Sequence, residues 1–587
     1  MKKNKNDIGI ITQLYWQLLP SQILCAMIGS LTTIINGIVV GSNLDLDSVA
    51  ALGVFGIMSA IIVSVSSLIS GGARIVCGKH IGRGEFDKVN SAFTASIILQ
   101  LCISVIFIIP FLFFSVPLAK LLGATGNIVE STALYIRSNC LGIIPMLISP
   151  CLMSFLDMNN KMKHSILCSF ILAACSLTFG IINIHVIHGG LFGIGIATSL
   201  AQIVCLICLA MKFVKDKSLT RFDFSHLKFS TFSEIVVLGL PSALTGLYSV
   251  RNICLNKFAG SLGGADAVTA LSILNTSGGI FDSIAVGIGS TSMMLGSVFY
   301  GEQDRNAVCR FAEFGHRMSF IINALKGVVL AIVARPIAII FGAEGVVLDM
   351  AYQLLMFYAI TMPFNAFPLF ILNYYASIGK TKLVNIYFFF TCLIFPLGSM
   401  VLLSKPLGLT AVWSSYLFAE IWMTFLILGV AWFKSKKFPT SYGEILFLPR
   451  DFGVTKENRM NITITNVDEV VEISRKVCEW AKERGADSKK SYMIGLCLEE
   501  MAANIVEHGF TKGKTNKNYY VDVFVRYENG EFTTRLRDNA PEFNPIARLK
   551  KDADDPMKNI GIKMVNKIAK EMNYQTTFGM NVLTITL

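Results

Sequence analysis

Residues 409–437 read LTAVWSSYLFAEIWMTFLILGVAWFKSKK, and this stretch marks the point at which the chain changes its solvent. Long apolar segments recur before it, and the chain after it is polar. Residues 455–587 hold 21 Lys or Arg and 19 Asp or Glu, whereas the preceding 454 residues hold only 30 and 20. This division predicts one part that lies in lipid and one that lies in water.

The apolar segments are long enough to cross a membrane as helices. Mean hydropathy is +0.59 over 587 residues, which is too high for a soluble protein, and runs of about 20 apolar residues match the thickness of a bilayer. We predict an all-α polytopic region with about twelve spans, at 18–40, 50–72, 92–116, 134–157, 164–187, 191–213, 233–256, 267–294, 316–340, 350–375, 384–404 and 409–433.

Basic residues predict how these spans are oriented. Nearly all Lys and Arg of the apolar part lie in alternate loops, such as Lys79, Arg83, Lys161 and Lys163. Because loops rich in Lys and Arg stay in the cytoplasm, we expect both termini and the polar part to be cytoplasmic, at the inner or plasma membrane of a prokaryote. The net charge of +12 lies in short loops rather than in one stripe, so we expect no nucleic-acid partner.

An internal duplication organises the apolar part. A shift of 218–221 residues superimposes Pro20 on Pro241, Gly82 on Gly301, Gly126 on Gly345, Pro145 on Pro363, Lys161 on Lys380 and Gly190 on Gly408. The duplication predicts two six-span repeats, at about 15–215 and 233–433, with a cleft between them. We therefore divide the chain into a membrane domain (1–437), a linker (438–459) and a polar domain (460–587).

The membrane domain resembles a known transporter family. Residues 36–41 (NGIVVG) close the first span, and the turns 82–85 (GRGE) and 301–304 (GEQD) follow the second and eighth spans. With the duplication, these features make the region similar to the multidrug and toxic compound extrusion (MATE) transporters. The resemblance implies a lipid bilayer around the domain, a small, often cationic organic substrate, and efflux driven by H⁺ or Na⁺.

Two acids are the candidates for coupling transport to the ion gradient. Asp282 and Glu420 lie nearest the middle of predicted spans, and their counterparts in the first repeat are uncharged. An ionisable group in a span is costly, and a carboxylate in a cavity can take up a proton on one side and release it on the other. Alternatively, Arg251 or Lys257 pairs with these acids as a structural salt bridge.

The resemblance is incomplete where the family often carries further acids. Many members have an acid in the first span at the position of Asn36. The repeat offset aligns Asn36 with Asn256, so the two amides either bond neighbouring helices or line the cavity.

The polar domain resembles a second family. Its pattern predicts a strand at 461–465, helices at 467–483 and 489–508, strands at 519–526 and 531–537, a helix at 562–572, and strands at 574–578 and 581–586. This order predicts a two-layer α/β fold with helices on one face of a mixed sheet. The region is similar to the GHKL-type (Bergerat) ATP-binding domain of histidine kinases and gyrase, and most of all to anti-sigma-factor serine kinases.

One helix of this domain carries the candidate catalytic group. Glu500, Asn504 and His508 follow each other at intervals of four residues, so they share one helical stripe. The resemblance implies that Glu500 polarises a water or an acceptor hydroxyl, that Asn504 binds Mg²⁺, and that His508 belongs to the nucleotide site. An ordinary solvated helix face is the alternative.

Two further segments complete the implied ATP site. Residues 537–545 (RDNAPEFNP) match the adenine-binding loop of the second family, with Asp538 on the adenine amine and Ala540 where that family has glycine. Asn559, Gly561 and Lys563 open a helix whose free N–H groups suit phosphate oxygens. Residues 552–558 would form a lid over the nucleotide.

Two functions remain open from the sequence. The first is a secondary efflux transporter whose cytoplasmic domain binds Mg-ATP and senses it or uses it as a kinase or ATPase. The second is a receptor-like membrane anchor for a serine kinase that acts on a regulatory partner, similar to an anti-anti-sigma protein. The chain has no P-loop, so the sequence does not predict a primary ATP-driven pump.

Overall fold

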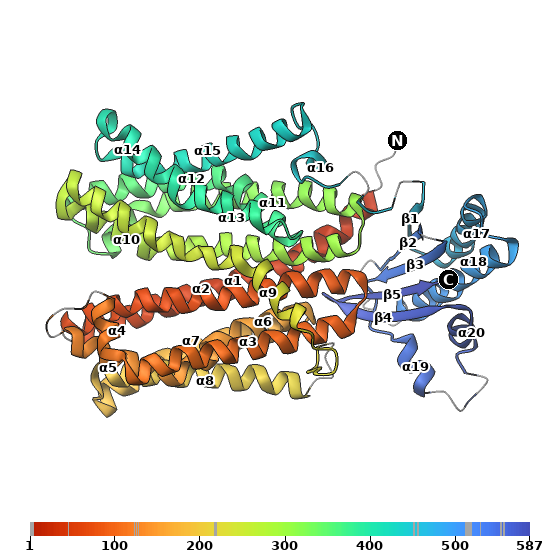
Figure 1. Ribbon diagram of the computed structural model, residues 1–587, viewed down its shortest axis with the longest axis horizontal. Coiled ribbons are helices and arrows are strands. Elements are labelled where there is room, and N and C mark those ends of the chain that lie inside the picture. The colour runs from red at the N-terminus through yellow and green to blue at the C-terminus, as the bar shows by residue number, and fades with distance from the viewer. Residues whose placement is uncertain are drawn as a thin grey trace.

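The computed structural model describes the chain except for residues 1–4, 45, 123, 125, 127, 216–219, 450–451, 455–456, 511–518, 529, 552–554 and 556–557. It consists of a long helical region with a small α/β domain at one end (Figure 1). We call this end of the helical region the domain-facing end.

The helical region follows the predicted duplication. The first repeat contains α1 (Lys5–Asn43), α2 (Leu46–Arg83), α3 (Phe86–Phe113), α4 (Ser115–Leu121), α5 (Ile128–Ser138), α6 (Ile143–Met158), α7 (Met162–Ile182) and α8 (Gly190–Lys215). The second contains α9 (Phe229–Ala243), α10 (Leu247–Gly301), α11 (Arg305–Ile340), α12 (Gly345–Ser377), α13 (Thr381–Phe389), α14 (Phe395–Leu407) and α15 (Thr410–Ser435).

Ten helical segments of the described chain are long and apolar enough to cross a membrane. One of them, Phe229–Gly301, covers two predicted spans, because α10 continues through a kink at Gly264 with φ 65° and ψ −155°. Only glycine adopts this conformation readily. With α1 and this kink counted, the helices correspond to the twelve predicted spans.

The α/β domain begins after a short linker helix, α16 (Tyr442–Ile445). Its elements are β1 (Arg459–Ile464), α17 (Val467–Glu483), α18 (Ser488–Asn504), β2 (Val521–Glu528), β3 (Glu531–Asp538), α19 (Pro545–Lys551), α20 (Ile560–Ile568), β4 (Glu571–Thr577) and β5 (Met580–Thr586). The helices cover one face of the sheet (Figure 1), where Val470, Leu498 and Val565 pack against Leu536 and Ile585 in a common core.

The sheet corrects one expectation from the sequence. Its strand order is β1-β2-β3-β5-β4, and every neighbouring pair is antiparallel, so the expected mixed sheet is wrong. The connection through α19 and α20 places β4 at the edge, parallel to β3. The turn at Phe578 and Gly579, both with positive φ, then returns β5 between β3 and β4.

Candidate transport cavity and nucleotide site

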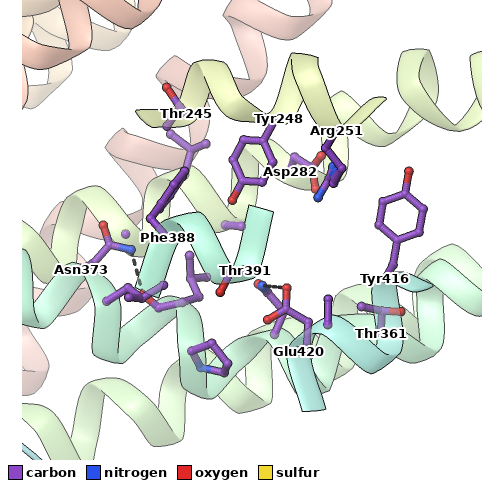
Figure 2. Close-up of a pocket in the computed structure, with 18 of the residues that line it drawn as sticks. Thr245, Tyr248, Arg251, Asp282, Thr361, Asn373, Phe388, Thr391, Tyr416 and Glu420 are labelled. Carbon is purple, nitrogen blue, oxygen red and sulfur yellow. Dashed lines mark hydrogen bonds between the residues drawn. The ribbon is translucent and has the colours of Figure 1, made fainter. Parts of the chain in front are cut away.

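A cavity of about 520 Å³ lies within the helical region and is lined mainly by the second repeat. Both predicted coupling acids, Asp282 on α10 and Glu420 on α15, line it. Figure 2 shows the two acids among Tyr248, Phe388 and Tyr416. The structure thus brings together two residues that are 138 positions apart in the sequence.

Each acid has a neutral hydrogen-bond donor. Asp282 accepts a hydrogen bond from the Tyr358 hydroxyl at 2.5 Å, and Glu420 Oε1 accepts one from Asn365 Nδ2 at 2.9 Å. The second oxygen of Glu420 is buried, and no described residue donates to it. A buried carboxylate oxygen without a donor strongly favours a proton or a bound cation.

The basic residues proposed as structural partners form no described ion pair with the acids, although Arg251 lines the same cavity. The Arg251 guanidinium lies 4.8 Å from the ring centroid of Tyr248 and 5.0 Å from that of Tyr416, which is the geometry of cation–π contacts. Among the described residues it makes no ion pair with Asp282 or Glu420. Lys257 is exposed.

The two asparagines aligned by the duplication are not brought together by any described contact. Asn36 lies on α1, but its side chain lies outside the described residues. Asn256 lies on α10, and its Oδ1 is buried without a hydrogen-bond donor in the described part of the chain. Their pairing and their role in the cavity stay predictions.

Close backbone contacts join the two repeats toward the domain-facing end. A Cβ atom on Gly301 of α10 would lie 2.3 Å from the carbonyl oxygen of Lys79 on α2. On the same helix α2, a Cβ on Gly72 would lie 1.9 Å from the carbonyl oxygen of Ile235 on α9. Only glycine permits such close helix packing, so no side chain fits between these backbones.

The α/β domain contains a second, smaller cavity of about 110 Å³. Asn504, His508, Asp538 and Ala540 all line it, so four of the residues implied by the resemblance meet at one place. Asn504 lies on α18 and His508 on the π-helical turn that follows it, whereas Asp538 ends β3.

The residues predicted to hold the adenine belong to a hydrogen-bond network. Asp538 Oδ1 accepts from the Ala540 N–H at 2.9 Å and from Asn581 Nδ2 at 2.8 Å. Asn581 Oδ1 in turn accepts from the Tyr574 hydroxyl at 2.9 Å, and burial raises the pKa of Tyr574. The structure adds Tyr574 and Asn581 to the residues that line this cavity, because β5 pairs with β3 and β4 pairs with β5.

The residues predicted to hold the phosphates lie at the start of α20. Asn559 precedes this helix in the left-handed conformation, with φ 53°. A Cβ on Gly561 would lie 2.1 Å from Glu500 Oε2, so the Glu500 carboxylate packs against the first turn of α20. Lys563 Nζ donates to the Asp555 carbonyl oxygen. Most of the predicted lid, 552–558, lies outside the described residues.

The donors present fit a magnesium nucleotide. Asn504 Nδ2 donates to the Glu500 carbonyl oxygen of its own helix at 2.6 Å, which fixes the amide and leaves its oxygen as the ligand atom. Mg²⁺ prefers oxygen ligands and needs few of them from the protein. Because Gly561 has no side chain, the Glu500 carboxylate can lie beside the N-terminus of α20. Helix N-termini suit phosphate oxygens.

The open face of the sheet lies against both repeats. Arg537 of β3 lies 3.3 Å from Glu302 in the turn after α10, and Arg459 of β1 lies 3.2 Å from Asp304. Gln575 of β4 donates to the Ile81 carbonyl oxygen of α2 at 3.4 Å. The turn 301–304 and the end of α2, where the Gly82 carbonyl oxygen accepts from Arg535 Nη2 at 3.1 Å, are therefore the contact sites of the domain.

The charge at this contact is strongly coupled. Although burial lowers the pKa of Arg537, Glu302 and Asp522 raise it above its ordinary value. Asp522 Oδ2 accepts from Arg537 Nη2 at 3.2 Å. Arg537 is adjacent to Asp538, so one strand carries both the contact with the helical region and a residue of the nucleotide pocket.

Comparison with known proteins agrees with this architecture. The MatE family model matches residues 21–182 and 241–400, one block in each repeat. The chain belongs to the MatE family. A model of the histidine kinase-like ATPase domain matches residues 465–587, which cover all of the α/β domain except β1.

Relatives of the family share the membrane part. Probable multidrug resistance protein YoeA of Bacillus subtilis is 20% identical over 365 residues, which are 60% of this chain and 78% of that protein. Probable multidrug resistance protein NorM of Streptococcus pneumoniae is 28% identical over 196 residues, 31% of this chain and 43% of that protein. A solved structure described as an outward-facing multidrug resistance MATE family transporter has a TM-score of 0.66 at 20% identity, covering 73% of this chain and 96% of that chain.

Proposed function

We propose that the chain is a secondary transporter that expels organic compounds by cation exchange, with Asp282 and Glu420 as the groups that carry the coupling H⁺ or Na⁺. The observation that carries this proposal is the cavity, which contains both acids, together with the close backbone contact of the two repeats toward the domain-facing end. Glu420 Oε2 has no described donor, so a cation that binds there replaces missing hydrogen bonds. Separation of the two repeats at this end would give the same acids access to the domain-facing side.

Transport in reconstituted vesicles tests this proposal. We expect the wild-type chain to move organic cargo in exchange for H⁺ or Na⁺ when a pH or sodium gradient is imposed, and Asp282→Asn or Glu420→Gln to abolish this coupling. Asp266→Asn is the matched control, because Asp266 is exposed on the same helix as Asp282. Normal gradient-driven efflux in both cavity variants would overturn the assignment.

We further propose that the α/β domain binds Mg-ATP and controls opening of the domain-facing end. Asp538 would hold the adenine, Asn504 the Mg²⁺, and the start of α20 the phosphates. Alternating access requires the two repeats to separate at this end, and the sheet contacts both of them through Glu302 and Ile81. Positive charge in the loops at this end supports a cytoplasmic position for the domain.

The alternative is a membrane-anchored serine kinase acting on an anti-anti-sigma-like regulatory protein. Control by binding and control by phosphoryl transfer differ in their need for Glu500. If ATP acts by binding, Glu500→Ala and a non-hydrolysable ATP analogue preserve the effect of nucleotide on cargo uptake, whereas Asp538→Asn removes it. Loss of the effect in Glu500→Ala, together with phosphate transfer to a second protein by the wild-type chain, would favour the kinase.

A further inference from the structure

Three cationic side chains line the transport cavity beside the two acids. Arg74 of α2 donates to Ser290 Oγ at 3.0 Å and to the Ser70 carbonyl oxygen at 3.3 Å. Arg251 of α10 lies between the rings of Tyr248 and Tyr416. Neither makes an ion pair within the part of the chain that the structure describes.

Lys326 of α11 is the most exceptional of the three. It is only 6% exposed and lines the cavity, yet no described residue forms a hydrogen bond or ion pair with its ammonium group. It lies near enough to Asp282 and Glu420 for electrostatic attraction, but Tyr358 and Asn365 hold oxygens of those acids. A buried ammonium group without a partner is costly unless a ligand supplies one.

We propose that the cargo is an aromatic zwitterion, whose acidic group binds Lys326 and Arg251 and whose basic group binds Asp282 and Glu420. This inference rests on the proposed transport function and specifies its substrate class. Tyr248, Tyr416 and Phe388 line the same space (Figure 2) and provide flat surfaces for an aromatic frame.

The charges of the cavity disfavour the two simpler kinds of cargo. A lipophilic cation would bring a positive charge to a space that already contains Arg74, Arg251 and Lys326, where low polarity strengthens repulsion. A simple anion would meet the same problem with Asp282 and Glu420. A zwitterion satisfies both the cationic and the acidic side chains. Protonation of the acids would weaken their attraction for its basic group and release it.

Equilibrium binding to the detergent-solubilised full-length protein tests the inference without a gradient. The probes are rhodamine B, which carries a carboxylate and a delocalised positive charge on an aromatic frame, and its methyl ester, which keeps only the positive charge. We expect fluorescence anisotropy to show at least tenfold tighter binding of rhodamine B. Lys326→Met should remove this preference, Arg251→Gln should reduce it, and Arg251→Lys should retain part of it.

Lys257→Met is the matched control, because Lys257 is an exposed lysine of the second repeat, and it should keep the wild-type ratio. Equal or tighter binding of the ester to the wild-type chain would overturn the inference, as would an unchanged ratio in Lys326→Met and Arg251→Gln. If Lys326→Met does not fold, the Arg251 pair decides. Because no gradient is applied, failure of coupled transport with the ratio intact would count against the transport proposal alone.

Discussion

At the residue scale, Asp538 combines an observed role in holding a loop with a predicted role in binding adenine. Its Oδ1 accepts from the backbone of Ala540 and from Asn581, so the carboxylate fixes the loop that surrounds the pocket. The same side chain lines the cavity at the place where the resemblance implies contact with the adenine amine. Asp538→Asn keeps the shape of the side chain and removes its charge. This substitution therefore separates support of the loop from recognition of the adenine.

We expect Asp538→Asn in the full-length chain to weaken ATP more than GTP, by about tenfold or more, because a site built to bond a polar group discriminates strongly when that bond is lost. Titration with both nucleotides in Mg²⁺ measures the ratio. Glu479→Gln, an exposed charge change on α17, should leave both affinities unchanged. An equal loss for ATP and GTP would mean that Asp538 only supports the loop.

The residues of the candidate nucleotide site differ in how far the sequence alone predicts them. Glu500, Asn504 and His508 follow from helical spacing, and the Asn466 side chain that accepts from the Glu469 N–H places the start of α17 at the predicted residue. Neither Tyr574 nor Asn581 is assigned to the nucleotide site by the sequence alone. They join the pocket only because β5 returns between β3 and β4, which is a matter of topology and not of local sequence.

At the scale of elements, the predicted helix at 562–572 ends early, at Ile568, because Glu571 begins β4 and pairs with Thr586. Pairing with a neighbouring strand here outweighs local helical preference. Helix α19 is absent from the prediction, because its seven residues are too few to show a helical pattern of apolar residues. The spans are predictable because apolar length alone determines them.

The close contact of α2 with α9 gives a prediction for one helix. Gly72→Ala places a methyl group against the Ile235 backbone and should destabilise the closed form by about 1–3 kcal/mol. Gly53→Ala on the same helix has open space around it and should be neutral or stabilising by about 0.5–1 kcal/mol. Thermal unfolding in detergent compares the two. Equal changes in thermal stability for the two variants would show that the contact of α2 with α9 does not stabilise the closed form.

At the scale of the whole molecule, the α/β domain connects the two repeats at the end where they must separate. The linker is fixed to the second repeat, since Lys380 donates to the Leu446 and Phe447 carbonyl oxygens and Tyr375 donates to that of Ile445. The turn after β4 reaches the first repeat, where the Phe578 N–H donates to the Met158 carbonyl oxygen. We therefore expect the attached domain to favour the form in which the repeats are closed at this end.

Glu302 is the acid on which this attachment depends most. Arg535 and Arg537 both lie within 3.7 Å of it, and Glu302→Ala leaves two nearly buried guanidinium groups short of a partner, at a cost of about 3–5 kcal/mol. We expect the domain to separate from the helices and the domain-facing end to open more often. Distances between spin labels placed on the ends of α2 and α11 should lengthen and broaden.

Glu85→Ala is the control, because Glu85 pairs with His80 and Lys88 inside the first repeat, and it should leave the distances unchanged. If Glu302→Ala also leaves them unchanged while the domain has separated, the domain does not hold the transporter closed, and nucleotide control of transport by this route is excluded.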